Sequence, residues 1–271
     1  MYKIIACDLD ETLLSTDGSI CSRNITNIRK ATELGVKFVL ATGRGYITTG
    51  RTLEILGLNN KAGEYVLSFN GGAITENRGM KLLHFEALPF EIAEELYRRG
   101  QNYRVGMHVY TKDKVYAYKP TPKEFEYVRG RIELTTVEYT DLDFLKGQEI
   151  AKCLYMNTDR KYLQQIERDF SDIAPLVDIS YSSNRYLEFN KRGVNKGAGL
   201  MKLAEMLGVD PKETIAIGDN FNDLPMIKAA GLGVGVKNTV EDMKPMCDII
   251  TDSTNNEGAV GEVIEKYILN A

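Results

Sequence analysis

The sequence predicts an α/β protein in which a parallel-sheet core is interrupted by an inserted α/β unit. Two observations support this prediction. Short apolar runs alternate with helical patterns near both ends of the chain, whereas the middle has strands and helices but none of the polar sequences that follow the outer strands. We therefore expect a core domain formed by residues 1–84 and 190–271 and an inserted domain formed by residues 85–189.

The first part of the chain fits a parallel βαβ unit. Residues 3–7 form an apolar run that is too short for a helix and is bounded by polar residues, as expected for a buried strand. A helix with apolar Ile25, Ile28 and Leu34 follows, and Gly35 ends it. The next expected elements are a strand at 36–41, a helix at 47–56 and a strand at 65–69. After Val194 the alternation resumes, with strands at 214–217, 233–236 and 249–251 and a helix at about 259–269.

The inserted domain has an alternation of its own. Apolar residues at helical spacing predict a helix at 89–99, and residues 105–110 and 115–118 are typical of a hairpin. Thr121-Pro122-Lys123-Glu124 is a capping box with proline at the first helical position, so a second helix is expected to begin there. A strand at 150–156, a helix from Thr158 and a strand at 177–181 complete the expected elements. The pattern suggests a weak internal βαβ duplication.

Polar side chains directly follow three of the expected core strands. In chain order they are Asp8 and Asp10, Thr42 (with the unhindered backbone of Gly43 after it), and Asp219 and Asp223. Open α/β sheets bind their ligands at the carboxyl ends of the strands. Lys196 is expected in the first turn of a helix, where a cation opposes the helix dipole and therefore needs an ion pair or a functional reason.

Each of these signals has a structural alternative when it is taken alone. Asp8 and Asp10 could cap a helix or a turn, Asp219 could cap the helix that follows it, and Lys196 could be one solvated lysine among many. Burying carboxylates is costly unless something pairs with them. Their occurrence together at successive strand ends favours one shared site.

Four short motifs carry a resemblance to a known family. They are DLDETLL at 8–14, ATGR at 41–44, NKG at 195–197 and GDNFNDLPM at 218–226. In this order the chain resembles the haloacid dehalogenase-like superfamily of phosphohydrolases over almost its whole length. It is most similar to the Cof-type branch, whose members also have a short turn like Asn70-Gly71-Gly72. The resemblance implies a Rossmann-like core domain and an inserted cap domain.

The residue types fit phosphoryl transfer. Asp8 is the candidate nucleophile, because a carboxylate can attack phosphorus and form a covalent intermediate that water then cleaves. A phosphate dianion about 4 Å from a carboxylate meets roughly 4 kcal/mol of repulsion per charge pair at an effective dielectric constant of 20, so the site must hold compensating cations. Lys196 supplies one cation and a metal ion the other. Hard oxygen ligands without a histidine or cysteine array favour Mg²⁺ over zinc.

The resemblance assigns expected roles to the motif residues. As metal ligands it implies the Asp8 carboxylate, the Asp10 carbonyl and the Asp219 carboxylate, with Asp223 in support. It implies that Thr42, the Gly43 amide and Asn222 hold the phosphoryl group. Lys196 is expected to bridge nucleophile and phosphate, and Asp10 to act as the general acid and base.

In the family resembled, the insert is a mobile cap whose residues select the leaving group. The candidates for substrate contact are Arg44, Asn70, Tyr181, Ser183, Arg185 and Tyr186. For the insert residues among them, the alternative is ordinary surface of the cap domain. A guanidinium such as that of Arg44 suits phosphate or polyol oxygens.

One position departs from the family pattern. Many relatives carry glycine where this chain has Glu11. The loop after Asp10 must therefore accept a side chain and an additional negative charge. We expect the Glu11 side chain to point out of the site.

Composition excludes several classes of partner. The net charge of −4 and the pI near 5.5, without a basic run, argue against nucleic acid or an anionic membrane surface. No apolar stretch approaches the length of a membrane span, and the first residues do not form a signal peptide. Cys7, Cys21, Cys153 and Cys247 have no metal-like spacing, so reduced thiols in the cytoplasm are expected. The oligomeric state is not indicated.

Three functions are compatible with the sequence. The first is a Mg²⁺-dependent phosphatase of small phosphorylated metabolites, such as sugar phosphates or phosphorylated cofactors. The second is a phosphomutase of the same superfamily, since an aspartyl phosphate can return its phosphoryl group to a sugar. The third is a non-catalytic phospho-accepting or metabolite-sensing protein. Asp10 and the large insert argue against the third.

Overall fold

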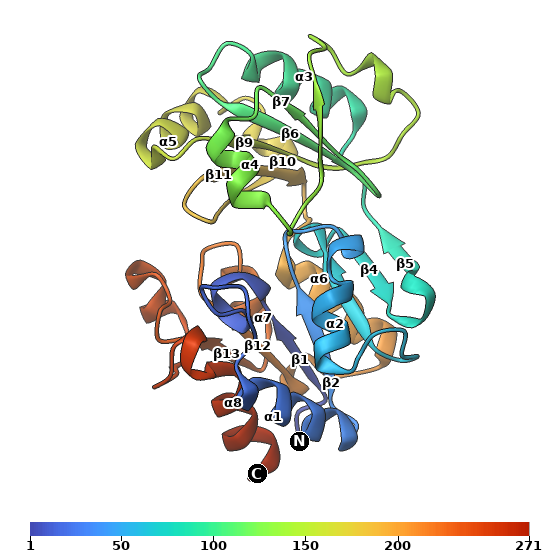
Figure 1. Cartoon of the computed structure of the whole chain (residues 1–271), viewed down its shortest axis with the longest axis vertical. Coiled ribbons are helices and arrows are strands. Elements are labelled where there is room, and N and C mark those ends of the chain that lie inside the picture. Colours follow the sequence, from blue (N-terminus) through green and yellow to red (C-terminus); the bar gives the residue numbers. More distant parts are fainter. Residues whose placement is uncertain (271) are drawn as a thin grey trace. The chain divides into compact units, whose positions relative to one another are not determined.

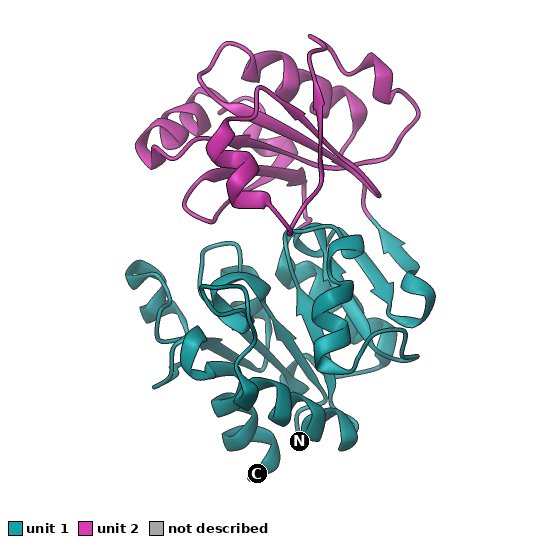
Figure 2. Cartoon of the chain, viewed as in Figure 1, with its two compact units in different colours: residues 1–85, 195–271 teal, residues 86–194 magenta. Residues whose placement is uncertain are grey.

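The computed structural model of the chain, shown in Figure 1, describes residues 1–270. The chain forms two compact units, which are coloured separately in Figure 2. Residues 1–85 and 195–271 make up one, here called the core unit, and residues 86–194 make up the other, here called the insert unit. The sequence-based division places these boundaries at 84/85 and 189/190.

The core unit contains an eight-stranded sheet with the order β14-β13-β12-β1-β2-β3-β4-β5. All neighbours from β14 to β3 are parallel, whereas β3, β4 and β5 pair antiparallel. The strands are β1 Ile4–Cys7, β2 Lys37–Ala41, β3 Tyr65–Ser68, β4 Ala73–Glu76, β5 Lys81–Phe85, β12 Thr214–Gly218, β13 Leu232–Gly235 and β14 Ile249–Ile250. The predicted parallel-sheet α/β core is confirmed, but the sequence pattern missed β4 and β5.

Helices cover both faces of this sheet (Figure 1). They are α1 Ser22–Glu33, α2 Gly50–Leu56, α6 Lys196–Leu207, α7 Leu224–Ala229 and α8 Ala259–Ile264. Alternate residues of β1 enter the two apolar clusters: Ile5 and Cys7 pack with α1, α2 and α8, and Ile4 and Ala6 pack with α6 and α7. A strand buried on both faces reads as a continuous apolar run, which is the pattern at 4–7.

The insert unit is a separate six-stranded sheet with the order β10-β11-β9-β6-β7-β8. Its pairs are antiparallel except for β7 with β8. The strands are β6 Gly106–Thr111, β7 Val115–Tyr118, β8 Leu134–Val137, β9 Ile150–Met156, β10 Val177–Ser182 and β11 Tyr186–Lys191, and the helices are α3 Phe90–Gly100, α4 Pro122–Val128 and α5 Arg160–Asp169. The predicted inserted α/β domain is confirmed, and the predicted hairpin is the β6–β7 pair.

One face of the insert sheet is apolar and the other is largely polar. Side chains of α3 and α5 pack with Val109, Tyr155 and Phe189 in the apolar cluster. Buried His108, Lys152 and Glu188 alternate with these residues along β6, β9 and β11 and therefore lie on the opposite face. No helix within residues 1–270 has the length and apolar composition needed to cross a membrane.

Candidate functional site

The site begins at the carboxyl end of β1. Asp8 is the first residue after the strand, and its backbone is extended, with ψ of 157°. The next residues form a wide π-type helical turn, Leu9–Leu13, in which Asp10 and Glu11 have non-helical dihedral angles. The Asp8 side chain is held in place from a distant part of the chain, because the ammonium group of Lys196 donates a hydrogen bond to its carboxylate.

Lys196 begins helix α6 and is completely buried. Asn195 caps this helix by accepting a hydrogen bond from the Ala198 amide at 2.9 Å. The Lys196 ammonium group bridges two carboxylates, binding that of Asp8 and, at 2.6 Å, that of Asp223. These two ion pairs explain why a cation occupies the N-terminal turn of a helix.

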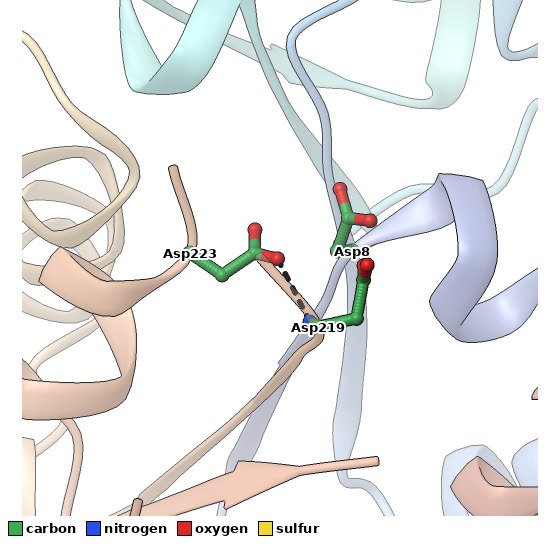
Figure 3. A group of neighbouring side chains, drawn as sticks. All are labelled: Asp8, Asp219 and Asp223. Carbon is green, nitrogen blue, oxygen red and sulfur yellow. Dashed lines mark hydrogen bonds between the residues drawn. The ribbon is translucent and has the colours of Figure 1, made fainter. Parts of the chain in front are cut away.

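Asp219 and Asp223 come from the turn that follows β12. The second carboxylate oxygen of Asp223 accepts hydrogen bonds from the Asp219 and Asn220 amides, at 3.0 and 3.2 Å, which fixes the turn. Asp219 accepts a hydrogen bond at 2.8 Å from the hydroxyl group of Thr12. Figure 3 shows the three aspartates together, and one carboxylate oxygen of each lies within 4.8 Å of the others.

The charges of this group do not balance. Three buried carboxylates, those of Asp8, Asp219 and Asp223, surround the single ammonium group of Lys196. Burial raises the pKa of Asp8 to about 7, and the Asp223 charge adds to this although Lys196 opposes it. Burial also raises the pKa of Asp219 well above its usual range, with Asp223 and Asp8 adding to the shift. The donor set therefore suits a hard divalent cation, because such an ion neutralises the surplus negative charge.

Lys196 stays charged in this environment. Burial alone would lower the pKa of its ammonium group. The carboxylates of Asp223 and Asp8 outweigh that effect and raise the pKa above its usual range. Lys196 is thus a fixed positive charge between the two aspartates.

The Asp10 carboxylate forms an ion pair with Arg44 and is not one of the three clustered carboxylates. Both oxygens of Asp10 accept hydrogen bonds from the Arg44 guanidinium group, one of them at 2.9 Å from Nε. Arg44 follows β2, and its amide donates to the hydroxyl group of Thr42 at 3.1 Å. The ends of β1 and β2 are therefore joined by a bidentate ion pair.

The remaining core candidates lie beside this network. Thr42 is buried, and its amide and carbonyl bind the Leu67 carbonyl and the Asn70 amide, respectively, at 2.9 and 3.0 Å. Gly43 is partly exposed in the same loop, and partly buried Asn222 lies one residue before Asp223. Asn70 is buried in the turn after β3.

The same family emerges from comparison with known proteins. Residues 5–264 match the family model described as haloacid dehalogenase-like hydrolase. This chain belongs to that family. The match includes every strand-end carboxylate of the site and the insert unit.

Relatives of this haloacid dehalogenase-like chain cover almost its full length. A protein of Streptococcus pyogenes is 30% identical over 99% of both chains. The 5-amino-6-(5-phospho-D-ribitylamino)uracil phosphatase of Bacillus subtilis is 29% identical over 98% of this chain and 96% of its own. A crystal structure of a haloacid dehalogenase-like hydrolase from Bacteroides thetaiotaomicron aligns with a TM-score of 0.82 and 31% identity, covering 98% of this chain and 99% of that one. The chain is a phosphatase of the Cof-type branch of the family.

The side chain of Glu11 is accommodated in this haloacid dehalogenase-like fold because it turns away from the three clustered aspartates. Its backbone is in the left-handed region, with φ of 61°, where glycine is the easiest residue to place. Its carboxylate accepts hydrogen bonds from Asn255 at 3.3 Å and Thr16 at 3.4 Å. The side chain thus points out of the site, as expected from the sequence.

The candidate residues of the insert unit do not share one face of its sheet. The Tyr181 hydroxyl group binds Glu167, and the ring packs with the apolar cluster of α3 and α5. Tyr186 is on the opposite face, where its hydroxyl group binds buried Glu124. Arg185 also binds Glu124, at 3.3 Å, and Ser183 is in the β10–β11 turn with φ of 53°. The structure brings Arg185 and Tyr186 together and separates Tyr181 from them.

Sequence reasoning missed Thr12 and the buried polar residues of the insert. Thr12 is in the DLDETLL motif, four residues after Asp8, and a short-range signal for it was therefore present. Its partner Asp219 is remote in the sequence, so the contact between the two residues could not be predicted from the sequence. His108, Lys152 and Glu188 gave no signal, because charged residues in a strand normally indicate a solvated face.

Proposed function

We propose that the protein is a Mg²⁺-dependent phosphatase that hydrolyses phosphate monoesters of small metabolites through a covalent phosphoryl group on Asp8. One observation carries this proposal. The Asp8 carboxylate, at the end of β1, binds the buried ammonium group of Lys196 next to two further buried carboxylates. A nucleophile, a fixed cation and an acidic donor set are the parts that phosphoryl transfer requires.

In the first step an Asp8 oxygen bonds to phosphorus while the bond from phosphorus to the ester oxygen breaks. The leaving oxygen takes a proton and departs as an alcohol. In the second step water attacks phosphorus, the bond to Asp8 breaks, and inorganic phosphate is released. Lys196 holds the Asp8 carboxylate in position and offsets negative charge that builds up on the phosphoryl oxygens.

The acidic donor set fits a magnesium ion. Asp8 and Asp219 would provide carboxylate oxygens and Asp10 its carbonyl, while Asp223 orients the turn through the Asp219 amide. When bound, Mg²⁺ supplies positive charge that offsets the repulsion between the substrate phosphate and the carboxylates. The surplus of negative charge in the site is the observation that supports this assignment.

Asp10 is our proposed general acid and base. Its carboxylate is two residues beyond the nucleophile and is oriented by the bidentate contact with Arg44. To donate a proton to the leaving oxygen, Asp10 must exchange this contact for one with the substrate. Arg44 is then free to bind a substrate oxygen, which reconciles its present partner with the proposed role in substrate binding.

The phosphoryl group is proposed to be held by neutral donors. Thr42 offers a hydroxyl group, Gly43 an unhindered amide and Asn222 a side-chain amide. All three belong to loops that follow β2 or β12, the strands on either side of β1. Donors without charge bind the oxygens and leave the charge balance to Lys196 and the metal ion.

The proposed substrates are sugar phosphates or phosphorylated cofactors, consistent with a relative named for a phosphorylated ribityl compound. Side chains from the insert unit, with Arg185, Tyr186 and Ser183 as candidates, and Asn70 of the core unit are proposed to select the leaving group. The expected location is the cytoplasm, where such metabolites occur. Neither nucleic acid nor a membrane surface is an expected partner, given the net charge of −4.

The test is phosphate release from sugar phosphates, nucleotides, flavin mononucleotide, pyridoxal phosphate and p-nitrophenyl phosphate, with Mg²⁺ or with EDTA. Asp8→Asn is the blank. Release that requires Mg²⁺ and disappears in the variant supports the proposal, and the best ester identifies the leaving group. If no ester is hydrolysed faster than by Asp8→Asn, the proposal is wrong. Turnover of a sugar phosphate only with a bisphosphate activator would instead identify a phosphomutase.

A further inference from the structure

The helix that carries Lys196 meets the turn after β3 at a contact between two glycines. A Cβ atom built on Gly199 of α6 would lie 2.6 Å from the Cα atom of Gly71. A Cβ atom built on Gly71 would lie 2.5 Å from the carbonyl oxygen of Asn195, the residue that caps α6. Real Cβ atoms do not approach backbone atoms this closely, so only glycine at both positions permits the observed separation.

The other side of the same helical turn is equally tight. A Cβ atom on Gly197 would collide with the carbonyl oxygen of Pro225, in the first turn of α7. Lys196 is thus followed within three residues by two glycines, Gly197 facing α7 and Gly199 facing the β3 turn. The first turn of α6 is held from both sides, and with it the direction of the Lys196 side chain.

The β3 turn itself is strained and firmly attached. Phe69, Asn70 and Gly71 have φ of 51°, 57° and 88°, three successive left-handed residues of which only one is glycine. The Phe69 amide donates to the Arg44 carbonyl and the Asn70 amide to the Thr42 carbonyl, both at 3.0 Å. The turn therefore connects the loop of Thr42 and Arg44 to the helix of Lys196.

We propose that Gly71 and Gly199 are positioning residues that set the place of the Lys196 ammonium group between Asp8 and Asp223. This inference rests on the proposed function. Lys196 must reach both carboxylates at once, and a displacement of about 1 Å in a reacting group is enough to cost about 100-fold in rate. The glycine contact fixes the helix at the distance where both ion pairs form.

The test is Gly199→Ala, with Gly50→Ala as the matched control. In an ordinary helix this substitution is favourable, because alanine is the better helix former. At Gly50, in the first turn of α2, an added Cβ meets no atom within 4 Å. At Gly199 it meets the backbone of Gly71, so α6 must move.

We expect Gly199→Ala to lower kcat for p-nitrophenyl phosphate about 100-fold per folded molecule, with little change in the Mg²⁺ concentration needed for half-maximal activity. The reason for this difference is that β1 and the turn after β12 carry the metal-binding carboxylates, whereas α6 carries Lys196. Gly50→Ala should behave as the wild type. A Gly199→Ala enzyme with the kcat of Gly50→Ala, or one that loses kcat and Mg²⁺ activation together, would overturn the inference. If the wild type itself releases no phosphate, the proposed function fails and the inference fails with it.

If Gly199→Ala does not fold, Asn195→Ala provides the second test. This change removes the cap of α6 and adds no atoms, so it loosens the turn that carries Lys196. We expect kcat to fall about tenfold, because the looser turn displaces the Lys196 ammonium group from its place between Asp8 and Asp223. Asp159→Ala removes the corresponding cap of α5 in the insert unit and is the control. Equal kcat values for the two variants would overturn the inference.

Discussion

Two lysines are buried among the described residues, one in each unit, and their surroundings differ. Lys196 in the core unit lies in a group of three buried carboxylates. Lys152 in the insert unit forms an ion pair with one buried carboxylate, that of Glu188. This carboxylate also accepts a hydrogen bond from Ser182. Because a balanced pair needs no further charge, Lys152 fits a structural role. The group around Lys196 has more carboxylates than cations, and this surplus is the observation that supports the proposed metal site.

The largest expected effects come from removing each lysine. Lys196→Met should reduce turnover by at least about 1,000-fold, because the charge that faces the phosphoryl group is lost. Lys152→Met should mainly lower the free energy of unfolding, by about 3–5 kcal/mol, because Glu188 is left buried without its cation. The measurements are kcat for p-nitrophenyl phosphate and urea unfolding.

A double variant sharpens this comparison. In Lys152→Met with Glu188→Gln the buried charges of the pair are removed together, so most of the lost stability should return. Stability as low as that of the single variant would show that the pair is more than a balanced structural contact. Equal losses of turnover in Lys152→Met and Lys196→Met would remove the distinction between the two lysines.

Magnesium should stabilise the chain through the surplus carboxylates. At about 100 times its dissociation constant, Mg²⁺ is expected to raise the free energy of unfolding by about 2.7 kcal/mol. Thermal melting with Mg²⁺ and with EDTA measures the effect. Asp219→Asn should abolish the shift, and Lys152→Met should keep it as the control. A full shift in Asp219→Asn would place the ion elsewhere.

The insert unit should respond to acid through His108. Burial lowers the pKa of this histidine to about 3, and the Lys152 charge adds to the effect although Glu188 opposes it. As the pH is lowered from 7 to 5, the unfolded chain binds a proton at His108 that the folded chain does not. The free energy of unfolding therefore decreases by about 2 kcal/mol over this range. The urea unfolding of wild type and His108→Leu should differ by this amount in their pH dependence. Identical pH dependence would contradict the expectation.

Glu11 should have the smallest effect. Its carboxylate faces Asn255 and Thr16, so it does not belong to the charge surplus of the core site. Glu11→Gln keeps the side-chain acceptor and is expected to change the Mg²⁺ activation constant less than about twofold, since separated exposed charges are screened. A change as large as that of Asp219→Asn would add Glu11 to the metal-binding group.

Local patterns sufficed to predict the parts of the site that follow buried strands. Asp8 and Asp219 end apolar runs, and Lys196 begins a helix at a recognisable cap. The sequence could not predict which distant side chains meet, such as Arg44 with Asp10 and Thr12 with Asp219. Those contacts depend on how the loops after several strands approach one another.

The sequence pattern also missed β8 and β11 of the insert unit, and the reason for missing these strands and β5 is different. β5 and β8 are half-exposed edge strands, so neither shows a continuous apolar run. β11 is fully paired and largely buried, but Glu188 and Asn190 interrupt its apolar residues. Its buried polar residues are stabilised by partners on other elements, which is information that a single strand does not contain.

The central pairing of the core sheet has a consequence for synthesis of the chain. β1 pairs with β2 on one side and β12 on the other, and β12 is made only after the whole insert unit. At about 5–20 residues per second, β1 waits on the order of ten seconds or more for this neighbour. During that time the apolar edge of β1 is unpaired, and the insert unit can complete its own sheet first. On the ribosome, the centre of the core sheet is therefore expected to close only after the insert unit has been made, and the apolar edge of β1 is open to aggregation until then.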